Sequence, residues 1–82
     1  MYNPISSEFF DQLNVAMQRK IPSTIKYYKN EEQEEKQDIQ QLKAIIKTMK
    51  IIDGFEFLVL DTKVEIRLSY VVKFNGKRHR KD

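Results

Sequence analysis

The chain has 82 residues, no cysteine and a formal net charge of +3, which favours a single domain without disulfides or thiolate metal sites. A chain of this length buries only about 60% of its unfolded surface, so we expect a small core. No segment reads as a signal peptide or reaches the length of a membrane span, so we expect a soluble cytoplasmic protein.

An amphipathic helix over about residues 6–20 is the first predicted element. Ser6 or Ser7 can cap its first turn, because a hydroxyl oxygen accepts one of the N–H groups that a helix start leaves without a partner. Pro22 lies just beyond its end. The side that would face the core carries apolar residues at helical spacing, namely Ile5, Phe9, Leu13, Ala16 and Met17.

A short strand is predicted at residues 23–29, where the run TIKYY combines aromatic and β-branched side chains. Ile25 and Tyr27 share one face of this strand, and we expect Tyr27 to pack in the core. Lys26 and Tyr28 take the other face.

Two patterns compete over residues 31–50. Asn30 with Gln33 resembles a capping box, and the glutamate, glutamine and lysine residues around them are good helix formers, which favours a helix. The dipeptide Asp53-Gly54, in contrast, is a signal for a two-residue hairpin turn, and such a turn needs a strand on each side. The residues alone leave two alternatives, a second long helix or an acidic loop followed by a strand.

After this turn the chain alternates between apolar and polar residues, which predicts antiparallel strands with one buried face. A polar break at residues 61–63 separates the first strand from a second alternating run. The apolar side of that run carries Val64, Ile66, Leu68, Tyr70, Val72 and Phe74. The C-terminal half is therefore predicted to be a β-meander.

Several motifs resemble those of Rof-like proteins, the family of the Rho-binding antiterminator. YNPI at residues 2–5 and FDQL at residues 10–13 are similar to the Tyr-x-Pro-Ile segment and the acidic, aromatic-containing helix that open Rof. EFLVL at residues 56–60 and EIRL at residues 65–68 are similar to a strand pair of that family.

Other segments resemble the YolD-like pattern. These are Tyr27-Tyr28 in the first strand, Ile45-Ile46 in the second and VVKF at residues 71–74 in the last. The sequence departs from that pattern at Ala44, where YolD-like chains usually carry glycine, and at residues 30–38, which replace a short turn.

The resemblance implies an α+β, mostly β fold, in which an N-terminal helix caps a small, five-stranded, strongly bent antiparallel Sm-like barrel. It favours a strand rather than a helix in the ambiguous segment, with the acidic stretch as its loop. We expect one Sm-like domain over residues 1–76 and a basic tail over residues 77–82. The expected strands span residues 23–29, 41–52, 55–60, 63–68 and 70–75.

Catalysis and metal binding have little support, and we predict that the protein is not an enzyme and has no catalytic residue, metal site or cofactor. His79 is the only histidine and lies in the basic tail, and there is no cysteine nucleophile. The carboxylates of residues 31–38 lack the spacing and the glycine of an EF-hand loop. Two glycines are too few to build a loop that cradles phosphate.

A basic tail and outward-facing cations favour nucleic-acid binding, because single-strand binders combine a positive track with aromatic faces. Tyr28 is the candidate stacking platform. For Arg67 the alternative is an ion pair with Glu65 or Glu56 on neighbouring strands, and for the tail it is a solvated extension. The candidate residues are Lys26, Tyr28, Arg67, Lys73, Lys77, Arg78, Arg80 and Lys81.

Protein binding is the competing function. Free strand edges could join a second copy into a homo-oligomer, and no membrane partner is expected. The resemblance implies a small bacterial or phage regulatory adaptor in nucleic-acid metabolism, either near DNA repair or as an inhibitor of Rho or a similar nucleic-acid-handling ATPase. A third alternative is an oligomeric interaction module. The predicted partner face of the helix carries Asp11, Asn14, Val15, Gln18 and Arg19.

Overall fold

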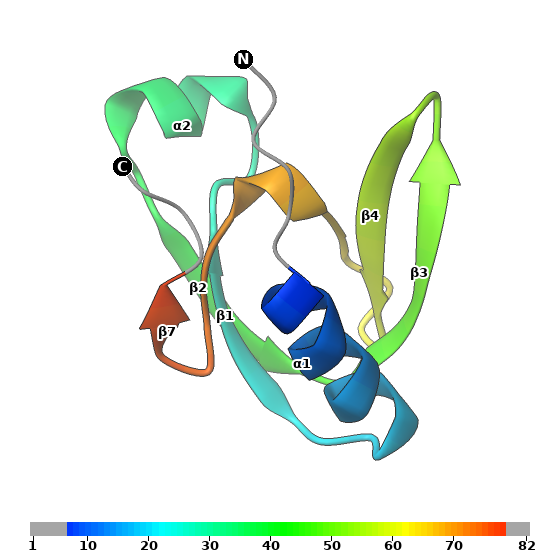
Figure 1. Ribbon diagram of the computed structural model, residues 1–82. Helices are drawn as coiled ribbons and strands as arrows, with labels where there is room; N and C mark the ends of the chain where they lie inside the picture. Colours follow the sequence, from blue (N-terminus) through cyan, green and yellow to red (C-terminus); the bar gives the residue numbers. More distant parts are fainter. Residues whose placement is uncertain (1–6, 79–82) are drawn as a thin grey trace.

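The computed structural model describes residues 7–78, and this part of the chain is an α+β fold made mostly of strands (Figure 1). One longer helix lies against two antiparallel sheets, a four-stranded sheet in the order β2-β1-β6-β7 and a three-stranded sheet in the order β3-β4-β5. The elements are α1 (Ser7–Gln18), β1 (Ser23–Tyr27), α2 (Glu31–Lys36), β2 (Gln40–Ala44), β3 (Ile46–Ile52), β4 (Phe55–Leu60), β5 (Glu65–Arg67), the 3-10 helix η1 (Leu68–Tyr70), β6 (Val71–Phe74) and β7 (Lys77–Arg78).

The predicted N-terminal helix is confirmed as α1, and its apolar side is buried. Phe9, Leu13 and Ala16 are at most 3% exposed. The helix ends in a Schellman motif, in which the N–H of Ile21 donates to the carbonyl of Ala16 at 2.9 Å. Lys20 has the left-handed φ of 54° that this motif requires.

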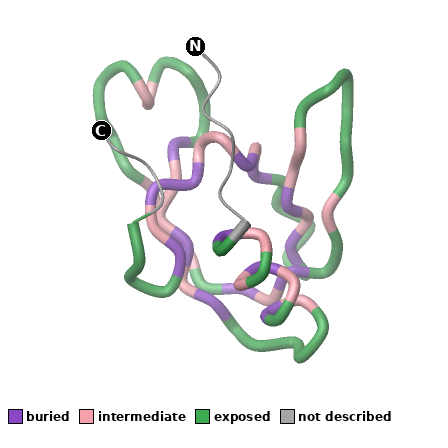
Figure 2. The backbone as a smooth tube through the Cα atoms, viewed as in Figure 1, coloured by how far each residue is buried: buried purple, intermediate pink, exposed green. Residues whose placement is uncertain are grey.

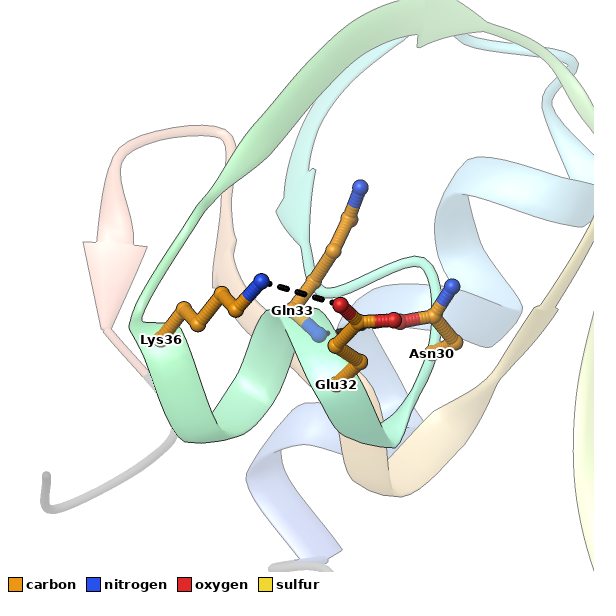
Figure 3. A network of polar contacts seen from close by, with 4 residues as sticks. All are labelled: Asn30, Glu32, Gln33 and Lys36. Carbon is orange, nitrogen blue, oxygen red and sulfur yellow. Dashed lines mark hydrogen bonds and ion pairs between the residues drawn. The ribbon is translucent and has the colours of Figure 1, made fainter.

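The predicted helix start at Asn30 is present, and it opens the short helix α2 (Figure 3). The Asn30 Oδ1 accepts the N–H of Gln33 at 2.9 Å, and the Gln33 Oε1 accepts the N–H of Lys29 at 3.0 Å. Lys36 pairs with Glu32 one turn earlier at 2.9 Å. The acidic stretch is therefore a capped helical turn.

This helix stops after six residues because Gln37 has a left-handed φ of 55°. The alternative of a long helix over residues 31–50 is wrong, since β2 and β3 occupy its second half. The expectation of a loop at residues 31–38 is also corrected, because local capping interactions fold that segment into α2.

A single break divides the predicted long strand of residues 41–52 into β2 and β3. Ile45 stands between them, and its N–H donates to the Asp61 side chain at 3.3 Å while its carbonyl accepts the Asp61 N–H at 2.9 Å. The chain bends here, so that β2 belongs to the four-stranded sheet and β3 to the three-stranded sheet.

Two tight turns of the same type set the register of both sheets. Asp53 and Gly54 have φ of 51° and 82°, and Asn75 and Gly76 have φ of 51° and 86°. Positive φ at both central residues is the type I′ geometry that matches the twist of a hairpin. The first turn confirms the predicted hairpin, whereas the second, which joins β6 to β7, was not predicted.

The sheets do not close into a barrel in the described part of the chain, so the closed barrel is a correction. No ladder among the described residues joins the two sheets, and the chain passes between them at Ile45 and through η1. The predicted strand at residues 63–68 shrinks to three residues because η1 takes Leu68–Tyr70. Among residues 7–78, no strand pairs with the outer edge of β5.

The core lies between α1 and the inner faces of both sheets. Ile25 and Leu58, one from each sheet, are fully buried. Phe9 of α1 meets Phe74 of β6 edge to face, with ring centroids 6.1 Å apart. Figure 2 shows the β3–β4 tip among the exposed segments.

Asn75 connects its turn to β1, which leads to the first prediction. Its side-chain oxygen accepts the N–H of Thr24 at 2.9 Å, and its own N–H donates to the Thr24 carbonyl at 2.8 Å. We expect Asn75→Ala to lower the free energy of unfolding by about 2 kcal/mol, because it loses a hydrogen bond and places alanine at positive φ.

Asn75→Gly is the matched variant, because glycine keeps the turn and loses only the side-chain bond to Thr24. We expect about half the loss. Urea unfolding followed by circular dichroism measures both values. Equal stability of all three proteins would contradict a role for this bond.

Candidate nucleic-acid interface

The outward face of the four-stranded sheet carries positive charges on adjacent strands. Lys26 of β1 lies opposite Lys73 of β6, and Lys73 lies opposite Arg78 of β7. Side chains directly opposite one another share a face. The neighbouring pair, Ile25 and Phe74, is buried on the inner face. Because side chains alternate along a strand, the opposed cations point outward. We call these three residues the cation row: Lys26, Lys73 and Arg78.

Lys43 extends this positive surface onto β2. It lies opposite Thr24, two residues from Lys26 and therefore on the same face of the sheet. Lys43 and Arg78 are exposed, and Lys26 and Lys73 are half-buried. Within residues 7–78 no carboxylate forms an ion pair with Lys26, Lys43 or Lys73.

The arrangement has an electrostatic cost. Like charges directly opposite each other on adjacent strands destabilise a sheet, and here Lys73 has a cation opposite it on either side. Strands lie about 4.8 Å apart, so three charged side chains start from backbone positions within roughly 10 Å. A bound polyanion would remove this repulsion.

The basic segment after Gly76 does not act as one unit. The Asn75-Gly76 turn folds Lys77 and Arg78 back along β6. Lys77 lies opposite Phe74 and so takes the inner side, where its Nζ pairs with the carboxylate of Glu8 in the first turn of α1. Lys77 therefore points away from the cation row. Arg80 and Lys81 lie outside the described residues.

Arg67 lies on the other sheet, among aromatic rings. Its guanidinium carbon is 3.8 Å from the centroid of Phe55 and 5.2 Å from that of Tyr70. It pairs with neither Glu65 nor Glu56; Glu65 instead accepts a 2.7 Å ion pair from a lysine of β3. Cation–π contact with two rings is therefore what holds Arg67.

A depression of about 490 Å³ adjoins these rings, between the end of β1 and the β5–η1 segment. Tyr27, Phe57 and Tyr70 line it, together with the charged residues Lys29, Glu65 and Arg67. β1 thus contributes to both surfaces, with Lys26 in the cation row and Tyr27 in the depression.

Tyr28, the predicted stacking platform, is only 3% exposed, and its N–H donates to the Tyr70 carbonyl at 2.9 Å. Its ring is therefore not presented to solvent. Lys43 was not among the predicted site residues, although its alternation with Leu42 and Ala44 indicates that it faces outward. Phe55 and Phe57 were predicted only as strand residues.

The predicted partner face of α1 lies away from the core. Asp11, Val15, Gln18 and Arg19 are exposed, and Asn14 is half-buried. Val15, at 46% exposure, borders a shallow depression formed with the β6–β7 turn.

Comparison with protein-family models, with curated proteins and with solved structures gives no match. The residues themselves therefore carry the functional argument. Residues 7–78 bring together no group of three acidic, histidine or cysteine side chains that could hold a metal ion. None of the helices in that range has the length and apolar character needed to cross a bilayer.

The cation row generates a prediction about stability. We expect Lys73→Glu to raise the free energy of unfolding by about 1 kcal/mol, because it replaces repulsion with Lys26 and Arg78 by attraction. Urea unfolding at low ionic strength measures the change, and added salt should reduce it. Lys47→Glu, on β3, makes the same change of net charge away from the row and should give no such gain. A destabilised Lys73→Glu protein would show that the row is not repulsive.

Proposed function

We propose that the protein is a non-enzymatic adaptor that binds nucleic acid across the outward face of its four-stranded sheet. The observation that carries this proposal is the cation row, Lys26, Lys73 and Arg78, with Lys43 beside it. Stacking like charges on adjacent strands costs stability, and a ligand with a regular series of negative charges offsets that cost. The phosphate backbone has such a series.

The aromatic depression supports a single-stranded ligand. Unpaired bases stack on aromatic rings and on arginine planes, while a duplex keeps its bases covered. Tyr27, Phe57, Arg67 and Tyr70 provide such surfaces beside the strand that also carries Lys26. Lys26 and Tyr27 are consecutive residues on opposite faces of β1, so a strand with phosphates on the cation row and bases at the depression must pass around the end of β1.

We further propose that the fold is an open version of the Sm-like barrel to which the sequence resemblance points. In support, β2 and β3 form one bent segment interrupted only at Ile45, and the strand after η1 pairs with β1. From the Rof-like and YolD-like resemblance we propose that this binding serves the regulation of transcription or DNA repair.

Anisotropy of labelled single-stranded RNA and DNA oligonucleotides over a salt series tests the proposal. With three or four cations on the ligand, the slope of log K against log salt should lie between roughly −2 and −3, at about 0.7 for each cation. Lys26→Ala and Lys73→Ala should each weaken binding and reduce the slope by about 0.7.

Lys36→Ala is the control, because it removes the same charge from α2, where Lys36 forms only an exposed ion pair with Glu32. It should leave the slope unchanged. If the full chain binds neither oligonucleotide at low salt, the proposal is wrong. The Rof-type alternative, a protein inhibitor of a nucleic-acid-handling ATPase, would then be favoured by the exposed side of α1 around Val15.

A further inference from the structure

The bent segment from β2 to β3 forms an open edge. β2 is the outer strand of its sheet and β3 is the outer strand of the other, so neither has a strand on its second side in the described part of the chain. β3 and β4 form a hairpin that stands away from the four-stranded sheet (Figure 1). An exposed edge of this kind presents backbone donors and acceptors to any extended chain.

The hairpin register identifies the outward backbone groups. Ile52 and Phe55 flank the two-residue turn, and in such a hairpin the flanking residues form a hydrogen-bonded pair. Because hydrogen-bonded and non-hydrogen-bonded pairs alternate along an antiparallel ladder, the preceding pair, Ile51 and Glu56, is not hydrogen-bonded. The N–H and C=O of Ile51, and likewise of Met49, therefore point away from β4. A contact of 3.4 Å from the Thr48 hydroxyl to the Met49 carbonyl is the only hydrogen bond recorded for these groups in residues 7–78.

Apolar side chains surround this edge. Ile51 is 70% exposed, Phe55 45% and Ile52 40%. A small hollow of about 190 Å³ lies here, lined by Phe10, Met49, Lys50, Ile51 and Glu56. A strand added to β3 could cover Ile51 and fill this hollow.

The charges of the edge determine which strand fits. Residues 39–52 contain three lysines, Lys43, Lys47 and Lys50, and no acidic residue. If two copies of β3 paired with each other, the charged side chains that meet would all be lysines, and their repulsion disfavours the pairing. Lysines on an edge strand commonly prevent this kind of self-association. A chain that carries acidic side chains is instead attracted at Lys47, whereas Lys50 already pairs with Glu65.

We propose that β3 binds an extended, acidic and apolar segment of a protein partner by strand addition at Met49 and Ile51. Apolar side chains of that segment cover Ile51, and acidic ones meet Lys47 and Lys50. Lys50 already pairs with Glu65 at an exposed site, so Lys47 supplies the charge without an ion pair in the described residues. This interaction is separate from the proposed nucleic-acid interface, because it uses the outer edge of β3, whereas that interface uses the outward face of the four-stranded sheet and the depression lined by Phe57 and Arg67.

A labelled peptide of alternating valine and glutamate, long enough to span β3, is the probe. Fluorescence anisotropy with the full chain should show binding, and the same peptide with lysine in place of glutamate should bind at least about fivefold more weakly. Lys47→Glu should weaken binding of the acidic peptide by about fivefold, because attraction becomes repulsion. Equal affinity for the two peptides would overturn the charge argument.

Ile51→Pro tests the strand addition itself. Proline removes only the outward N–H of Ile51 and leaves the ladder to β4, so the fold should persist while peptide affinity falls about tenfold. Ile51→Val keeps both that N–H and an apolar side chain and is the matched control. In the unmodified protein, the peptide should also slow amide hydrogen exchange at Met49 and Ile51, a measurement that does not depend on a variant that folds. Unchanged exchange at both amides on a saturated complex would overturn the proposal.

Discussion

The rest of this structure depends on the bend between β2 and β3, where two hydrogen bonds connect Ile45 to Asp61. They lie at the one residue where the long second strand changes from one sheet to the other. β2 precedes this residue in the four-stranded sheet, and β3 follows it in the three-stranded sheet. Because the chain bends there, each sheet has its own outward face, and a protein of this size can present two separate surfaces.

β1 connects the two surfaces. It lies between β2 and β6 and is held at one end by Asn75, which exchanges hydrogen bonds with Thr24. Strand alternation then places Ile25 in the core and Lys26 outside. The next residue, Tyr27, lines the depression beside η1. The Asn75-Gly76 turn has a second effect, since it fixes β7 so that Arg78, and not Lys77, faces the same way as Lys26.

Both proposed surfaces attract negative charge, but in different forms. The cation row offers side chains across the middle of a sheet, which suits a flexible polyanion whose contacts are mainly electrostatic. The edge of β3 offers backbone groups and apolar side chains, which suits an extended peptide. An adaptor needs two such sites that can be occupied together. The acidic helix α2 connects β1 to β2 and contains no buried residue.

The sequence by itself determined the local structure. Helical spacing specified α1, the Asp53-Gly54 dipeptide specified the β3–β4 hairpin, and alternation specified most strands, because these features depend on neighbouring residues. Only the tertiary structure decided which distant side chains meet. The opposition of Lys26 to Lys73, the burial of Tyr28 and the stacking of Arg67 on Phe55 depend on strand pairing. Alternation marks two faces on a strand, but the neighbouring strand and its register decide what each face contacts.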